Sequence, residues 1–182
     1  MPRTRYANVS SEGALYKMAG MVKRAFTDPT VIQAAKAITN LVADRDDLGE
    51  IEAVFTAVKS GTPAVPGLVN GVRYVSDPRD TDYYTAPAEL LSQCSAGSCG
   101  GDCDDQSMLV AALLGALGFM VGLRAYAPDG VRGDYEHVYP VVCYPKEFDQ
   151  TPQQVLGLDT TVPESYVGWE PPKAYVMTAW VE

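Results

Sequence analysis

The sequence predicts an α+β protein in which helices pack against a mainly antiparallel sheet. Apolar residues recur at helical spacing through roughly the first 60 residues, whereas strand-like segments dominate after residue 118. Strands and helices do not alternate along the chain, as a parallel βαβ sheet would require. The chain has 182 residues, 47% of them hydrophobic, and no evident internal linker. We therefore predict one domain over residues 1–182.

Three helices are expected within residues 12–60. The first covers residues 12–26, and Thr27-Asp28-Pro29 ends it and begins the second, since proline is favoured in the first helical turn. The third follows residues 44–47. Inward-facing side chains at helical spacing include Leu15, Met18, Val22, Val31, Ala34, Ala35, Ile51, Val54 and Phe55.

The rest of the chain predicts loops, one buried helix and several strands. Residues 60–87 are rich in Pro, Gly and Asp and predict an extended loop with a short strand at 72–75. Residues 87–93 predict one or two helical turns, and Asp102 occupies the N-cap position of a helix that ends at Gly118. Strands are expected at 119–126, 136–143, 155–160 and 173–181, with a turn at 128–130. Pro140 predicts a bulge or a sheet edge.

Charge and composition argue against several classes of function. The net charge is −9 and the pI about 4.5, so the surface repels phosphate and we expect no nucleic-acid partner. The longest apolar stretch, residues 108–123, is shorter than a membrane span and contains three glycines, so we expect no membrane segment. The first residues have no signal-peptide core, which predicts a cytoplasmic protein. In that reducing compartment the four cysteines are expected to be free thiols.

Cys103 is the candidate nucleophile. It follows two glycines and Asp102 at the predicted start of a helix, where the helix dipole favours a thiolate and the glycines allow close approach of a substrate backbone. Asp102, Asp104 and Asp105 act in the opposite direction, because nearby negative charge disfavours a thiolate. We expect the helix N-terminus and a histidinium partner to lower the pKa of Cys103 below its ordinary value.

His137 is the only histidine in the chain and therefore the candidate base. It lies early in a predicted strand, and Asp159 lies in the next one. If these strands are neighbours, the Asp159 carboxylate can accept a ring N–H of His137. This would fix the tautomer and stabilise the imidazolium, as thiol catalysis requires.

Segments around these three residues resemble the transglutaminase-like superfamily. GGDCDDQSMLVAALLGALGF looks like its Gly-Asp-Cys helix, EHVYPVV like its His strand and LDTT like its Asp strand, in the family's order. VRYVSDPRDTDYYTAPAELL is similar to the lead-in of small members from bacteria and tailed phages. The resemblance covers roughly residues 48–162. It implies a papain-like core over about residues 72–182, with Cys103 on a central helix and His137 and Asp159 on an antiparallel sheet.

The resemblance also implies an activity, since members form a thioester and pass the acyl group to water or an amine. We predict hydrolysis of a peptide or amide bond, with no metal or cofactor. The chain has no room for the β-domains of the large animal transglutaminases and no calcium loop at Asp102, so water is expected to outcompete an amine. Aromatic walls for an amine tunnel would come from Tyr83, Tyr84, Tyr166 and Trp169. The oxyanion would bind the Cys103 backbone N–H and a second donor, for which Tyr83, Tyr84 and Gln93 are candidates.

Loops 61–71 and 76–87 are expected to flank the cleft, and their Pro and Tyr content favours an extended peptide, protein or peptidoglycan-like substrate. Transamidation is the alternative reaction. A catalytically idle assembly module, with phage structural proteins as partners and a place in a virion, is the non-enzymatic alternative.

Two further hypotheses involve the other cysteines. Cys94, Cys99, Cys103 and His137 could supply four zinc ligands, although their spacing is not that of the usual close pairs. Alternatively, Cys99 could form a reversible disulfide that guards the nucleophile under oxidation. Two unpaired loop thiols are the simpler reading.

Overall fold

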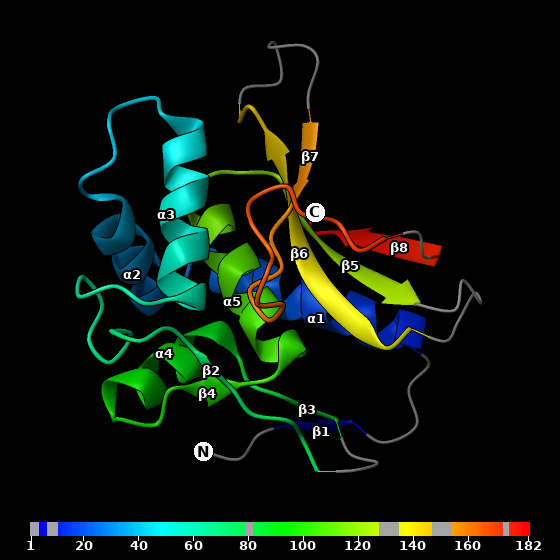
Figure 1. Ribbon diagram of the computed structural model, residues 1–182. Helices are drawn as coiled ribbons and strands as arrows, with labels where there is room; N and C mark the ends of the chain where they lie inside the picture. Colours follow the sequence, from blue (N-terminus) through cyan, green and yellow to red (C-terminus); the bar gives the residue numbers. More distant parts are fainter. Residues whose placement is uncertain (1–3, 7–10, 79–81, 128–134, 147–153, 173–174) are drawn as a thin grey trace.

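The centre of the fold is a four-stranded antiparallel sheet (Figure 1). The computed structural model describes residues 4–6, 11–78, 82–127, 135–146, 154–172 and 175–182. The strand order is β7-β6-β5-β8, formed by β5 (Val121–Ala127), β6 (His137–Tyr144), β7 (Gln154–Gly157) and β8 (Tyr175–Trp180). Every pairing in this sheet is antiparallel. The predicted α+β class, with a mainly antiparallel sheet, is therefore confirmed.

The described residues form five helices: α1 (Ser11–Ala25), α2 (Pro29–Thr39), α3 (Asp47–Lys59), α4 (Pro87–Ser95) and α5 (Cys103–Ala116). Helices α1 and α5 pack against the sheet, and α2, α3 and α4 pack against α5. Helix α5 lies between the sheet and helices α2, α3 and α4, and α1 lies beside it against the sheet (Figure 1). Its residues from 105 to 114 are all buried. Local caps explain the starts of α2, α3 and α5, because Asp28, Asp46 and Asp102 each accept a backbone N–H of the first turn.

Two small sheets lie beside this core. Strand β1 (Thr4–Tyr6) pairs antiparallel with β3 (Asp82–Tyr84), and β2 (Arg73–Tyr74) pairs parallel with β4 (Gly100–Gly101). Only β2 was expected from the sequence. The β2–β4 pairing places Tyr74 opposite Gly101, two residues before the candidate nucleophile.

The later strands differ from the prediction at their ends. Strand β7 stops at Gly157, so Asp159 lies in the following loop and not in a strand. The predicted turn at residues 128–130, and residues 173–174 of the last predicted strand, lie outside the described residues. Within the part of the chain that is described, no helix is both long and apolar enough to cross a membrane.

Pro140 forms no bulge, so that alternative is wrong, but it does stand where β6 loses its strand neighbour on one side. Strand β6 has a neighbour on each side, and Pro140 pairs in regular register with Leu123 of β5. On the other side the β7 ladder ends where Val141 pairs with Gly157, and the Pro140 carbonyl accepts the N–H of Leu158. Proline is tolerated because it stands at the end of that ladder, where its missing N–H breaks no strand pairing.

The prediction of four free thiols is also wrong. Cys94, near the end of α4, forms a disulfide with Cys99, while Cys103 and Cys143 are free. Gly97 has a φ of +87°, which reverses the chain after α4 and brings Cys99 back to Cys94. The expectation of free thiols rested only on the reducing compartment and took no account of the turn at Gly97. A disulfide involving Cys99 is therefore confirmed, and its proposed protective role stays a prediction.

Candidate active site

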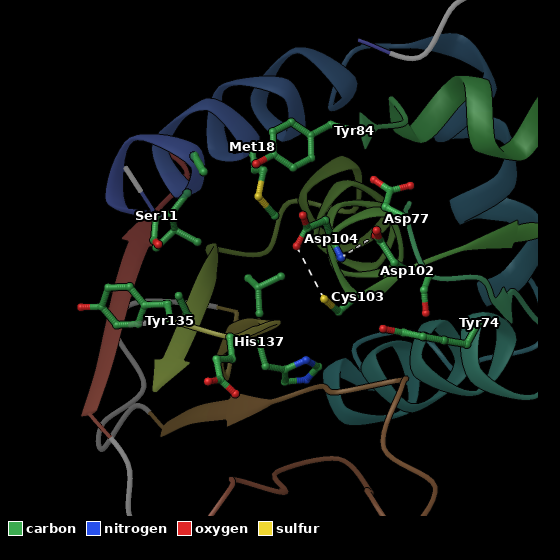
Figure 2. Close-up of a pocket in the computed structure, with 16 residues that line it drawn as sticks. Ser11, Met18, Tyr74, Asp77, Tyr84, Asp102, Cys103, Asp104, Tyr135 and His137 are labelled. Carbon is green, nitrogen blue, oxygen red and sulfur yellow. Dashed lines mark hydrogen bonds between the residues drawn. The ribbon is translucent and has the colours of Figure 1, made fainter. Parts of the chain in front are cut away.

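A cavity of about 230 Å³ lies where α1, β2, α5 and β6 meet (Figure 2). Cys103 and His137 both line it. Its wall also contains three tyrosines and four carboxylates: Tyr74, Tyr84, Tyr135, Asp77, Asp102, Asp104 and Glu136. The fold thus brings the candidate nucleophile and the candidate base, 34 residues apart in sequence, to one cavity.

Cys103 is the first residue of α5, and the residues before it fix its position. The Asp102 carboxylate accepts the N–H groups of Asp104 at 3.1 Å and Asp105 at 3.2 Å. A side chain at Gly101 would meet the Asp105 side chain at 2.6 Å, so only glycine fits beside this cap. The two N–H groups that Asp102 caps do not include that of Cys103. The Cys103 N–H lies in the first turn of α5, where helix N–H groups lack intrahelical acceptors.

The Cys103 sulfur lies in surroundings that favour the protonated thiol. Its Sγ is 3.6 Å from Oδ1 of Asp104, as the dashed line in Figure 2 marks. Burial raises the pKa of Cys103 strongly, the negative charges of Asp104 and Asp102 raise it further, and a hydrogen bond from the Val138 backbone opposes them in part. The prediction of a lowered pKa is therefore wrong, because burial and the two carboxylates outweigh the helix N-terminus.

His137 and Asp159 form the expected pair. Nε2 of His137 lies 2.6 Å from Oδ2 of Asp159, and the Asp159 side chain is only 1% exposed. Strand β7 ends before it reaches the start of β6, so the edge of β6 beside His137 is open to the loop that carries Asp159 (Figure 1). A carboxylate can only accept, so Nε2 carries the proton and Nδ1 is left for other chemistry.

Asp159 is held as an anion. Burial alone would raise its pKa, but the hydrogen bond and charge of His137 and two hydrogen bonds from Thr161 outweigh it, so the pKa is lowered. Those bonds run to Oδ1 from the Thr161 N–H at 2.9 Å and from its hydroxyl at 2.8 Å. The second oxygen thus remains directed at His137. The His137 ring also packs edge-on against Tyr126 and stacks with Tyr139, which limits its rotation.

Only one of the three predicted oxyanion donors lines the cavity. Tyr84 is 3% exposed and lines the cavity. Tyr83 lies in β3 without lining it, and Gln93 lies on α4, where its amide donates to Glu89 at 3.3 Å. Of the predicted aromatic walls only Tyr84 lines the cavity, since Tyr166 is 65% exposed elsewhere and Trp169 belongs to the loop after β7.

Sequence reasoning missed two residues of this site. Tyr74 lines the cavity, and Figure 2 shows its hydroxyl end turned toward Cys103. Burial, and then the charge of Cys103, raise the pKa of Tyr74. Gln106, 2% exposed, donates to the Gly101 carbonyl at 3.2 Å and accepts from the Thr160 hydroxyl at 2.9 Å. It links the two segments that carry Cys103 and Asp159. Its position one turn after Cys103 in the helix was the available signal.

The zinc hypothesis fails. Cys94 and Cys99 use their sulfurs in the disulfide, so the four predicted ligands do not converge. Among the residues that the structure describes, no group of three or more His, Cys, Asp and Glu side chains is arranged to hold a metal.

Comparison of the chain with protein-family models, with curated proteins and with solved structures found no match.

Proposed function

We propose that this protein is a cysteine-dependent acyl-transfer enzyme of the transglutaminase-like type, which hydrolyses a peptide or amide bond through a thioester on Cys103. The observation that carries the proposal is the hydrogen bond between the buried Asp159 carboxylate and Nε2 of His137. His137 and Cys103 line the same cavity. A histidine oriented by a buried carboxylate next to a helix N-terminal cysteine is the arrangement that nucleophilic catalysis needs.

Acylation starts from the neutral thiol, because burial and the carboxylates disfavour a free thiolate. Nδ1 of His137 takes the thiol proton as Sγ attacks the substrate carbonyl carbon, and the carbonyl electron pair moves to oxygen. When the tetrahedral intermediate collapses, the C–N bond breaks and the imidazolium returns its proton to the leaving amine. Asp159 stabilises the imidazolium throughout and remains ionised.

Deacylation uses the same groups in reverse. His137 takes a proton from water, the water oxygen attacks the thioester carbon, and collapse expels Sγ, which receives the proton from the imidazolium. The products are a carboxylic acid and the regenerated thiol. The acyl group is expected to come from a peptide, protein or peptidoglycan-like chain.

The oxyanion needs two donors. We assign the first to the Cys103 backbone N–H in the first turn of α5. For the second we favour the Tyr74 hydroxyl over the earlier candidates, because Tyr74 lines the cavity with its hydroxyl end turned toward Cys103 (Figure 2). Tyr74 is 53% exposed, so it stands at the rim, where an incoming carbonyl would pass.

The experiment follows cleavage of a panel of peptides and peptidoglycan fragments, with and without a millimolar primary amine. Cleavage should disappear in Cys103→Ala and fall steeply in His137→Ala and Asp159→Asn. Cys143→Ser is the matched control, because Cys143 is the other free cysteine and lies buried in β6, away from the cavity. A dominant amine-linked product would replace hydrolysis by transamidation, and a Cys103 inert to every electrophile would favour the assembly-module alternative.

A further inference from the structure

Lys59, the last residue of α3, reaches the loop that carries Asp159. Its Nζ donates to the carbonyl of Val162 at 2.8 Å, the carbonyl of Ser165 at 2.7 Å and the hydroxyl of Ser165 at 2.6 Å. An ammonium group has three protons, so these bonds occupy its whole donor capacity. The ammonium also lies 5.3 Å from the centroid of the Phe55 ring, one turn earlier on α3.

The groups that bind Lys59 belong to the turn that positions Asp159. The Ser165 hydroxyl contacts the Asp159 backbone carbonyl as well as the Lys59 ammonium. The Val162 N–H donates to Oδ1 of Asp159 at 3.3 Å. Residues 158–172 form no helix or strand, so bonds of this kind fix the turn in place.

The charges around Lys59 also link it to Asp159. Burial lowers the pKa of Lys59, and the charges of Asp159 and Glu164 oppose that effect. The Asp159 carboxylate that binds His137 therefore attracts the Lys59 ammonium, and a nearby cation favours the anionic form of Asp159.

We propose that Lys59 is a positioning residue: it holds the 159–165 turn against α3 and, through that turn, keeps Asp159 aligned with Nε2 of His137. The effect of Lys59 on catalysis rests on the proposed function, whereas its effect on the tautomer of His137 does not. Lys59 does not line the cavity, and its hydrogen bonds run to Val162 and Ser165 of the turn, so the proposed effect passes through Asp159.

The test exploits the single histidine of the chain. Nitrogen chemical shifts of a histidine ring distinguish its tautomers, so a spectrum of ¹⁵N-histidine-labelled protein reports on His137 alone. At a pH where the ring is neutral, the native protein should show one tautomer with the proton on Nε2. Lys59→Met, which keeps the aliphatic stem and removes all three donors, should give a mixture of both tautomers.

Lys146→Met is the matched control. Lys146 also packs over an aromatic ring, Phe119 at 4.2 Å, and also bonds α3, through Glu50 at 2.7 Å. Its loss should leave the single tautomer of His137 unchanged. If a substrate is found, Lys59→Met should lower kcat roughly 10- to 100-fold with little change in KM, since displacement of a catalytic group by about 1 Å has costs of this size.

A single Nε2–H tautomer in folded Lys59→Met would overturn the proposal, as would an equal tautomer change in Lys146→Met. If Lys59→Met does not fold, Ser165→Ala decides, because it removes the hydroxyl that bridges Lys59 and Asp159. Mixed tautomers in Ser165→Ala support the proposal, and an unchanged ring contradicts it. Failure of the proposed function would appear separately, as absent cleavage in a native protein whose histidine still shows one tautomer.

Discussion

Replacing Asp104 by Asn should make Cys103 more reactive. The Asp104 carboxylate lies 3.6 Å from the sulfur and, after burial, is the largest cause of its raised pKa. Two unit charges at this distance repel by about 4–5 kcal/mol at an effective dielectric constant near 20. Measured effects of neighbouring charges are smaller, about 1–3 pKa units. Asparagine keeps the shape of the side chain and removes this repulsion.

The expected change in alkylation rate follows from that shift. The thiolate population rises tenfold for each unit by which the pKa falls, but a less basic thiolate is a weaker nucleophile, with a Brønsted coefficient of about 0.4–0.5. The net acceleration of iodoacetamide labelling is therefore roughly 3- to 60-fold. Burial and Asp102 remain, so the pKa of Cys103 should stay above its ordinary value.

Intact-mass kinetics at mildly alkaline pH measure this rate, and Cys143 provides a slow internal reference because it is buried. Glu136→Gln is the matched control. Glu136 lines the same cavity but is exposed and is not among the groups that chiefly raise the pKa of Cys103. Unchanged or slower labelling of Cys103 in Asp104→Asn would refute the reasoning. Equal acceleration in Glu136→Gln would show that the net charge of the cavity, and not the adjacent carboxylate, controls the thiol.

Three further predictions concern the surroundings of the site. Asp159→Asn should destabilise the protein at pH 7: the folded-state pKa of Asp159 is depressed, so its ionic stabilisation is present above the unfolded value of about 3.9 and is lost as pH falls through the folded value. Urea unfolding at pH 7 and pH 3 should show that difference shrinking in acid, and an equal difference at both would contradict it. Gln106→Met should cost about 1–3 kcal/mol in the same assay, because it leaves the Gly101 carbonyl and the Thr160 hydroxyl without their partner; no loss would show that water replaces the amide. Reduction of the Cys94–Cys99 disulfide, which joins residues five apart, should lower stability by about 2 kcal/mol, and a Cys94→Ser, Cys99→Ser variant should not respond to the reductant.

Much of the fold could be predicted because its signals are local. Asp28-Pro29 and Asp102 mark helix starts by their own side chains, and α1 and α5 begin within one residue of the predicted positions. The small strands could not be predicted, since β1, β3 and β4 have only two or three residues and exist through pairing with distant segments. Pairing between distant segments leaves no periodic signal in so short a stretch.

The candidate site, too, could be predicted only in part. The pairing of His137 with Asp159 was expected from residue types and order, and the structure contains it at 2.6 Å. Tyr74 was not predicted, because only the β2–β4 pairing brings it beside the segment that precedes Cys103. The direction of the Cys103 pKa was misjudged because burial, its largest cause, depends on the folded packing of α1, α5 and β6 around the sulfur.

The proposed chemistry is tested most directly by the mass of the intact protein after brief exposure to the peptide and peptidoglycan panel, quenched in acid. We predict an acyl adduct on Cys103 that hydroxylamine removes, that is absent in Cys103→Ala and that forms more slowly in His137→Ala. Substrate cleavage that continues in Cys103→Ala, or an adduct that maps to Cys143 instead, would contradict a thioester mechanism at this site.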